Sequence, residues 1–497
     1  LHRDGPLHDG PRVSTARRRK VIRASNLDAA MLYAETAEMP MHTLGVLILE
    51  RTDGADEASP FEIMRKLFAA RIHLIPPFRR RVVQGPLQIG DPHWIEDPAF
   101  DLDQHLVRVV LPSPGGMRQL GDFVGAFAAS PLDRGRPLWK AALVEGLQDD
   151  RLSLVMKIHH APKDGGRAAA IAGELLDDAP EGRPIPATDE PRVTDREPSI
   201  PWLASDTLQT LLGKPKRAIA ATRRVASAVR ARGTAQPQAP PQAAPPEKAP
   251  LFEAPPTPFN RALTPNRSVG LSDVSFEDVK AIKQAFGTTV NDVVLAACCA
   301  SLRSWLAAHG GLPERPLIAT VPVSVRREGD EAGNRVSVIR VHLPMDLDDS
   351  VERLLTIHEE THRQKLRHRG KGGGDVLRDF ADIVTNVTVP WFLTHLMGFY
   401  SSHHLADRVP PLWNLVISNI AGPPVPLYTA GARLTHLFPL GPVQQGSGLN
   451  ITVMSVVDRL CFGALACTEL VPAVQDIATG FVDEIERLKG CIGRAQM

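Results

Sequence analysis

The sequence predicts an α/β protein with two core-bearing halves joined by a linker. The chain has 497 residues, more than one hydrophobic core usually supports, and its 43% hydrophobic content is enough for two cores. Strand-like and helix-like apolar patterns alternate on both sides of residues 184–256, where proline and alanine accumulate. We therefore expect a disordered basic arm at residues 1–24, a first lobe at 25–183, a basic helix with a Pro/Ala-rich linker at 184–256, and a second lobe at 257–497.

The first half alternates strand and helix signals in order. Ser25 and Asp28 form a cap pattern in front of a short helix, and glycine or proline punctuates the later segments. After that helix the expected elements are a strand at 41–50, a helix at 60–72, a strand at 107–111, a helix at 122–129, and two antiparallel strands at 140–147 and 151–160.

The last of these strands ends in two adjacent histidines, His159 and His160. Apolar side chains occupy alternate positions from Leu152 to Ile158, which predicts one strongly buried face. His160 continues the apolar parity and His159 the opposite one, so the two imidazoles are expected to have different roles. Asp164 follows in the first turn of a predicted helix, where a carboxylate suits the helix dipole.

Each histidine also has a less specific interpretation. A lone histidine on an apolar face more often fills a hydrogen-bonded core position than it catalyses a reaction. The spacing His-His-x-x-x-Asp-Gly, which ends at Gly165, favours chemistry, because it resembles the signature of the CoA-dependent acyltransferase superfamily. A neutral imidazole can accept a proton near pH 7. The second pair, His403 and His404, lacks the Asp-Gly and is assigned to a helix end or an interface.

Charge and cysteine usage narrow the function classes. The 57 basic and 56 acidic residues leave a formal net charge of +1, so the overall charge attracts neither nucleic acid nor a membrane. The spacing of the five cysteines matches neither a disulfide framework nor a zinc site, and we expect no metal. A reducing, cytoplasmic environment fits this pattern. No secretion signal and no bilayer-spanning run is expected, and residues 389–400 better suit an interfacial or tunnel-lining helix.

A local basic stretch lies within the predicted linker region. Residues 202–232 have helical periodicity on either side of Pro215, and no acidic residue occurs between Thr207 and Gln236. A basic amphipathic segment of this kind suits anionic lipid surfaces, so peripheral contact with a membrane or a lipid inclusion is expected. The alternative is a solvated helix that shields the linker.

The second half is again mixed in type. Ser275 and Thr289 each begin a predicted helix with a capping pattern, and the longer helix stops at Gly310. The remaining expected elements are strands at 317–325, 336–343 and 415–420, a helix at 350–367, a hairpin of strands at 449–457 and 460–467, and a closing helix from 473 to about 491.

Taken in order, short stretches of the chain resemble motifs of the bacterial wax ester synthase/diacylglycerol acyltransferase family. That family belongs to the CoA-dependent acyltransferase superfamily, whose signature the His159 heptad resembles. The resemblance covers roughly residues 25–180 and 257–490. The matching stretches are 25–28, 100–105, 131–133, 137–139, 159–165, 257–260, 291–296, 322–326, 333–335 and 418–424.

The resemblance implies a fold and a reaction. The fold would have two lobes like those of chloramphenicol acetyltransferase, each a mixed, mostly antiparallel sheet with helices, around a central tunnel. Acyl-CoA would enter from one end as co-substrate and diacylglycerol or a long-chain alcohol from the other. No resident cofactor and no nucleic-acid partner are implied. The product would be triacylglycerol or a wax ester.

The resemblance also assigns roles to residues. His160 would be the general base and His159 a supporting residue, while Asp164 would be structural, with a helix-cap role as the alternative. Asn291 is a candidate oxyanion donor, and a plain position in the first helical turn is its alternative. The other motif positions, of which those at 137–139 and 418–419 are expected to shape the tunnel, are Pro137, Leu138, Trp139, Gly165, Asp292, Ser418 and Asn419.

Two other functions remain open from the sequence. One is a condensation-type enzyme that takes its acyl group from a carrier protein. The other is a catalytically degenerate lipid-binding or membrane-binding protein. Lys163 slightly favours the latter, because the family more often has an apolar or small residue before the aspartate.

Overall fold

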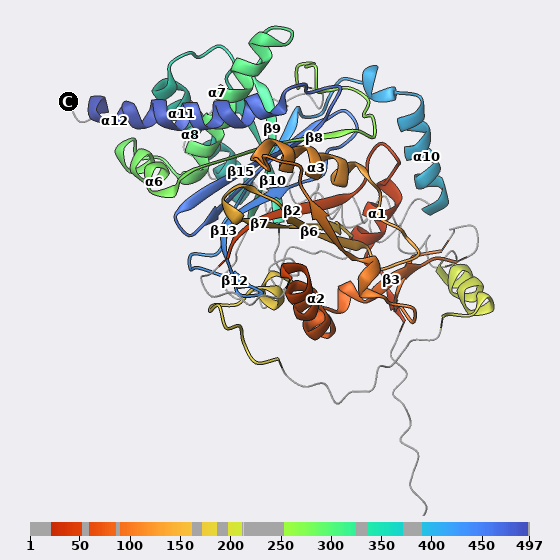
Figure 1. Ribbon diagram of the computed structural model, residues 1–497. Coiled ribbons are helices and arrows are strands. Elements are labelled where there is room, and N and C mark those ends of the chain that lie inside the picture. Colours follow the sequence, from red (N-terminus) through yellow and green to blue (C-terminus); the bar gives the residue numbers. More distant parts are fainter. Residues whose placement is uncertain are drawn as a thin grey trace, which may run out of the picture.

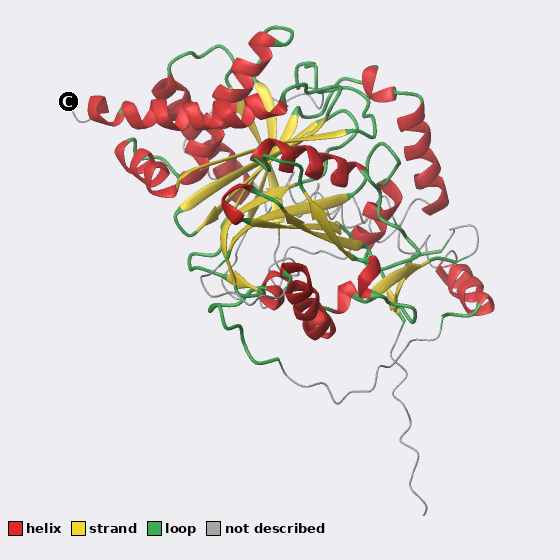
Figure 2. Cartoon of the chain, in the orientation of Figure 1, coloured by secondary structure: helices red, strands yellow, loops and turns green. Residues whose placement is uncertain are grey.

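The computed structural model describes residues 21–51, 59–85, 90–161, 171–185, 197–210, 212, 253–324, 336–370 and 390–495. Two six-stranded sheets form its centre, helices pack on these sheets, and a smaller three-stranded sheet lies at the edge (Figures 1 and 2). The predicted α/β class with mixed sheets is confirmed.

The first large sheet contains the strand that ends in the histidines. Its order is β12-β13-β2-β7-β6-β5, and only β5 and β6 are parallel neighbours. Because β7 lies between β2 and β6, it is an interior strand of the sheet. The bounds are β2 His42–Glu50, β5 Leu106–Val110, β6 Trp139–Glu145, β7 Leu152–His159, β12 Tyr428–Thr429 and β13 Ala432–Leu440.

The second large sheet has the order β10-β9-β11-β14-β15-β8. The strand β11 is parallel to both of its neighbours, and the other pairs are antiparallel. Its bounds are β8 Arg267–Ser275, β9 Leu317–Ser324, β10 Val336–Leu343, β11 Leu415–Ile420, β14 Leu449–Val456 and β15 Arg459–Cys467.

Helices pack on the second sheet and form the larger core with it. The long helices α7 and α11 lie at the centre of this layer (Figure 1). Residues Val293 to Cys299 of α7 are completely buried. The predicted caps at Ser275 and Thr289 are confirmed, since each side chain accepts a backbone N–H three residues on. The helices are α6 Phe276–Ala285, α7 Val290–Ala308, α8 Ser350–Gly370, α11 Val474–Gly490 and α12 Ile492–Ala495.

The two large sheets share core side chains rather than forming separate units. The helix α3, Met117–Ala129, lies against β8, and a Cβ atom on Gly125 would come 2.6 Å from the Arg267 carbonyl oxygen. Glycine is therefore needed where this helix meets the strand. The core around the first sheet also includes Val269, Leu271 and Cys461 of the second.

The strand β13 comes from the second half of the chain but pairs with β2 in the first sheet. It also packs against β14 and β15, so closely that a Cβ atom on Gly463 would lie 2.4 Å from the Pro439 carbonyl oxygen. The sequence did not predict this strand, nor β8. The predicted linker at 184–256 falls mostly outside the described residues, so its boundaries stay predictions.

The third sheet corrects one predicted boundary. Its order is β1-β4-β3, with β1 Ile22–Arg23, β3 Arg80–Val83 and β4 His93–Glu96. Residues 22–23 were expected to belong to a disordered arm that ended at residue 24, but they pair with β4. Arg23 holds this edge through ion pairs with Asp91 at 3.5 Å and Asp206 at 2.5 Å. Residues 1–20 lie outside the described residues.

The remaining helices lie at the periphery. They are α1 Asn26–Ala34, α2 Pro60–Arg71 and α10 Pro390–Ser402, and residues 200–210 are also helical. The capping pattern at Ser25 and Asp28 is confirmed. Among the described helices only α7 is long and apolar enough to cross a membrane, and 72% of its apolar window is buried inside the protein.

Candidate active site

The strand β7 positions both histidines, but not as its alternation predicted. All eight residues of β7 are buried, because the strand is interior and both faces are covered. The expectation of one buried and one exposed face is therefore wrong. The strand ends at His159, which is 1% exposed, and His160 lies just beyond its end with a half-buried side chain.

Both ring nitrogens of His159 face groups that define its role. Nδ1 accepts a hydrogen bond from the Ala161 backbone N–H at 3.0 Å, which leaves the ring proton on Nε2. Nε2 lies 3.6 Å from Oε1 of Glu35. The backbone N–H of His159 donates to the Leu138 carbonyl at 2.9 Å. His159 thus contacts Glu35 through one ring nitrogen and the backbone of Ala161, the residue after His160, through the other.

Three hydrogen bonds fix the Glu35 carboxylate. Oε2 accepts from Nε and Nη2 of Arg134 at 3.1 and 2.6 Å, and Oε1 accepts from the Met41 backbone N–H at 3.2 Å. Burial alone raises the pKa of Glu35, but His159 and Arg134 outweigh burial and lower this pKa to about 2. Glu35 is therefore a permanent negative charge beside the histidine pair at neutral pH.

His160 is held from both sides of its backbone. Its own N–H donates to the Met41 carbonyl at 2.7 Å, and the next N–H, of Ala161, donates to His159. The Glu35 carboxylate accepts a hydrogen bond from the Met41 backbone and also faces His159, so it contacts both residues that bind this part of the backbone. The bonds to Met41 and His159 therefore fix the backbone position of His160, whose side chain is half-buried at the end of β7.

Two buried bases hold the C-terminal end of α3 beside the histidine strand. Nζ of Lys157 donates to the carbonyl oxygens of Phe127 and Ser130, both at 2.7 Å, and to the Ser130 hydroxyl at 2.8 Å. Nε2 of His42 lies 2.7 Å from the Ala128 carbonyl oxygen. These bonds satisfy carbonyl groups that a helix end leaves unpaired. They also fix the start of the segment that carries Arg134.

The titration of Lys157 predicts a pH-dependent stability. Burial, with a smaller contribution from Lys140, lowers the pKa of Lys157 from 10.5 to about 7. Above pH 7 the unfolded chain binds more protons than the folded one, so the free energy of unfolding rises with pH. We expect the free energy of urea unfolding of wild type, relative to that of Lys157→Met, to rise by on the order of 1–2 kcal/mol between pH 7.5 and pH 9. A difference between the two proteins that does not change with pH would contradict this result.

The segment 137–139 lies beside the histidine strand, since Trp139 in β6 pairs with Ile158 in β7. The Trp139 ring is stacked on Phe78 and His105, with centroids 4.4 and 4.7 Å apart, and its indole N–H donates to the Phe78 carbonyl. Leu138 is buried and its carbonyl binds His159, while Pro137 is also buried. These residues support β7, and their expected place along a tunnel stays a prediction.

In the second lobe, the predicted Asn-Asp pair lies in the first turn of α7. The fully buried Asp292 accepts hydrogen bonds from the backbone and side chain of Thr289, at 3.0 and 2.8 Å. It also binds Nδ1 of His358 at 2.7 Å and the Thr361 hydroxyl at 2.6 Å. Asp292 therefore caps α7 and ties it to α8.

Asn291 takes no part in that cap, and its buried Nδ2 has no hydrogen-bond partner in the part of the chain that the structure describes. Its oxyanion role stays a prediction.

The remaining predicted positions fall into two groups. Ser418 and Asn419 are half-buried in β11 and pair with Thr452 and Val453 of β14. Lys163, Asp164 and Gly165 lie outside the described residues, as do all of 162–170. Within the described ranges, no group of three or more His, Cys, Asp or Glu side chains is arranged to hold a metal ion.

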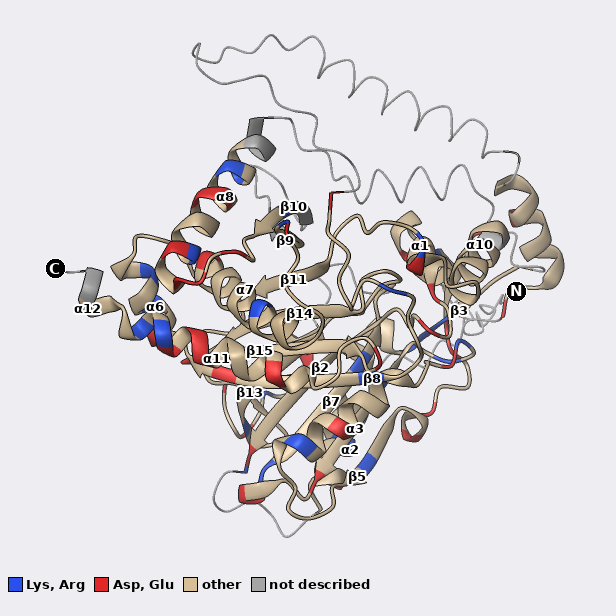
Figure 3. Ribbon diagram, turned by 90° about the horizontal axis from the view of Figure 1, so that it is seen from above, with Lys and Arg blue, Asp and Glu red and all other residues tan. Residues whose placement is uncertain are grey.

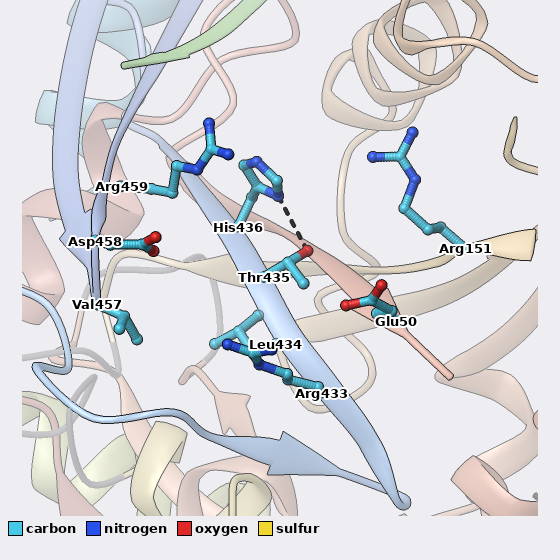
Figure 4. Close-up of a pocket in the computed structure, with 9 residues that line it drawn as sticks. All are labelled: Glu50, Arg151, Arg433, Leu434, Thr435, His436, Val457, Asp458 and Arg459. Atoms are coloured by element: carbon cyan, nitrogen blue, oxygen red, sulfur yellow. Dashed lines mark hydrogen bonds between the residues drawn. The ribbon is translucent and has the colours of Figure 1, made fainter. Parts of the chain in front are cut away.

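The cavity in Figure 4 does not belong to the histidine pair. Its volume is about 260 Å³, and β2, β13, the residue before β7 and the turn between β14 and β15 supply its walls. Arg151, which directly precedes β7, lies eight residues before His159, about 26 Å along a strand. A second cavity of about 330 Å³ lies between α7 and α11. Neither shows the predicted tunnel, which stays a prediction.

Comparison with known proteins places this geometry in context. Residues 24–294 match the family model described as the wax ester synthase/diacylglycerol acyltransferase catalytic domain, and residues 332–489 match the corresponding C-terminal domain. A Mycobacterium tuberculosis protein named as a diacylglycerol O-acyltransferase is 34% identical over 475 residues, which cover 94% of this chain and 90% of that one. The O-acyltransferase WSD of Acinetobacter baylyi is 28% identical, over 95% and 97% of the two chains.

Solved structures show the same fold. The wax ester synthase/diacylglycerol acyltransferase of Marinobacter aquaeolei VT8 superimposes with a TM-score of 0.68 at 28% identity, covering 95% of this chain and all of that one. The first condensation domain of the CDA synthetase superimposes with a TM-score of 0.53 at 14% identity, over 96% and 97% of the two chains. The second likeness concerns the fold alone.

Proposed function

Since the chain belongs to the wax ester synthase/diacylglycerol acyltransferase family and is an O-acyltransferase, we propose that His160 is its general base. The substrates are a long-chain acyl-CoA and the hydroxyl group of diacylglycerol or a long-chain alcohol. His160 removes the hydroxyl proton as the oxygen attacks the thioester carbonyl. The tetrahedral intermediate then expels the CoA thiolate, which takes the proton back from the imidazolium.

The way the His160 backbone is held supports this role most directly. The carbonyl of Met41 and the ring of His159 bind consecutive N–H groups, so the imidazole is presented at the end of a rigid strand. The fixed charge of Glu35 stabilises the positive charge that develops on the base. The thioester itself supplies the activation, so the proposed reaction needs no resident cofactor.

Free-thiol release tests the reaction class. Purified protein is incubated with acyl-CoA and a panel of alcohols that includes diacylglycerol and a long-chain alcohol. Thiol release that requires both substrates, with ester formed in equal amount, is the expected result. Transfer only from a carrier-protein thioester would favour a condensation-type enzyme, and no transfer from either donor would favour a degenerate binding protein.

We also propose that the enzyme contacts lipid surfaces peripherally. Residues 214–232, which lie outside the described residues, contain Lys214, Lys216, Arg217, Arg223, Arg224, Arg230 and Arg232 and no acidic side chain. Co-sedimentation with anionic liposomes is expected to weaken as salt rises, because screening shortens to about 8 Å at physiological ionic strength. Deleting the segment should reduce this binding and spare activity on water-soluble substrates. If the deletion variant co-sedimented like wild type, another part of the protein would make the salt-dependent contact.

A further inference from the structure

The helix α10 exposes an apolar face to solvent. Phe392, Leu396 and Phe399, at helical spacings of four and three residues, are 49%, 45% and 51% exposed. They therefore lie along one side of the helix. No Asp, Glu, Lys or Arg occurs among its thirteen residues. A helix with an uncharged apolar face in water is unusual unless another surface covers that face.

The segment that follows α10 extends the exposed apolar surface and adds positive charge. Val409 and Leu412 are exposed, and so is Arg408 between them and the helix. The acidic residue of this segment, Asp407, accepts a hydrogen bond from the Ala262 backbone N–H at 2.8 Å. Aromatic and aliphatic side chains bordered by a cation suit the boundary between phospholipid headgroups and acyl chains.

The inner side of α10 packs on residues 35–41, which contact the histidine pair. Met397 contacts the cluster that contains Met39 and Met41. The Ser401 hydroxyl donates to Oε2 of Glu38 at 2.7 Å. Residues 35–41, which include Glu35 and Met41, therefore lie between α10 and the histidine pair. A lipid surface on the outer side of α10 would be one helix away from this segment.

A second helix with exposed apolar residues reaches the same part of the molecule. In residues 200–210, Ile200, Trp202 and Leu208 are exposed, while Leu203 packs on the three-stranded sheet. Both this helix and α10 adjoin α1. The helix α10 packs on α1 directly. Thr207 of helix 200–210 packs against Gly90, and the Gly90 carbonyl accepts a hydrogen bond from the hydroxyl of Tyr33 in α1. Figure 1 shows α10 and the olive-coloured helix 200–210 on the same side of the molecule.

We propose that α10 and helix 200–210 form a docking face for a phospholipid surface, which brings the part of the molecule that carries His160 to the lipid that contains its acceptor. This inference rests on the proposed transfer of acyl groups to lipid hydroxyls. It differs from the salt-dependent contact of the basic segment, because apolar insertion does not require anionic lipid and persists at high salt. If an unrelated protein covers this face instead, vesicle binding will not depend on the apolar side chains of α10.

The test compares two triple variants of the full chain. Phe392→Gln, Leu396→Gln and Phe399→Gln remove the apolar face of α10, and glutamine keeps the helix propensity. The matched control, Leu312→Gln, Leu355→Gln and Leu366→Gln, removes three leucines of similar exposure elsewhere. Two of these lie on α8, which Figure 3 shows at the opposite end of the molecule from α10.

Binding to zwitterionic phosphatidylcholine vesicles at high salt is measured for both variants. We expect the α10 variant to lose at least about tenfold in vesicle affinity and to show a raised KM for vesicle-embedded diacylglycerol. Its kcat on a short-chain soluble alcohol should equal that of wild type, and the control variant should match wild type throughout. Equal vesicle binding by a folded α10 variant and wild type would overturn the docking face. Loss of acyl transfer to the soluble alcohol in the wild type would instead overturn the proposed function, and the vesicle comparison would still decide the docking face.

Discussion

Replacing His160 by alanine is expected to lower turnover by a factor on the order of 10² to 10⁴ while the protein stays folded. The substitution removes the group that accepts the hydroxyl proton, and it leaves the backbone bonds to Met41 and His159 in place because they use main-chain N–H groups. Turnover is measured as free thiol released per folded molecule at saturating acyl-CoA.

His159→Ala is the matched comparison for this variant. It removes a buried ring that bonds Ala161 and faces Glu35, so it should lower the unfolding temperature and loosen His160. The two variants should therefore differ in kind, one losing chemistry and the other losing stability. Near wild-type thiol release by a folded His160→Ala protein would remove the general-base assignment.

Glu35→Gln is expected to lower turnover on the order of 10- to 100-fold. Glutamine keeps the shape of the side chain but removes the charge that pairs with Arg134 and faces His159. The imidazolium that forms in the reaction is then less stabilised, so kcat should fall more than the affinity for acyl-CoA.

Glu38→Gln is the control for a nearby carboxylate that does not face the histidines. Its carboxylate binds the Ser401 hydroxyl on α10. We expect kcat of this variant to remain close to that of wild type. If Glu35→Gln and Glu38→Gln lowered kcat equally, with equal losses of unfolding temperature, the role of Glu35 would be structural only.

Local patterns in the sequence predicted most elements of the fold. Capping side chains at Ser25, Ser275 and Thr289 placed helix starts correctly, because a cap depends on residues only three positions apart. The period-two alternation placed β7, and the short Asp458–Arg459 connection placed the β14–β15 hairpin. These signals need no knowledge of distant parts of the chain.

Long-range packing explains what the sequence did not predict. The burial of both faces of β7 depends on its neighbours β2 and β6 and on α3, none of which its own alternation reports. The pairing of β13 with β2 joins residues almost 400 positions apart. The alternation therefore suggested that His160 shares the buried face, whereas the structure buries His159 instead.

The candidate site shows the same division. The histidine pair was found from a local motif, but Glu35 directly follows the end of α1 and has no distinctive spacing in the sequence. Arg134 lies between 131–133 and 137–139, two stretches that resemble motifs of the family. This position is the sequence signal that could have identified Arg134 as a site residue. Only the fold brings Arg134, Glu35 and His159 together, over sequence separations of about a hundred residues.

The pH dependence of kcat/KM for thiol release, compared among wild type, His160→Ala and His159→Ala, tests the role of His160 most directly. A base that must be neutral to act gives an activity that falls as the medium becomes acidic. We predict that this acid limb is present in wild type and in folded His159→Ala and absent from the residual activity of His160→Ala. An acid limb of the same shape in His160→Ala would show that another group accepts the proton.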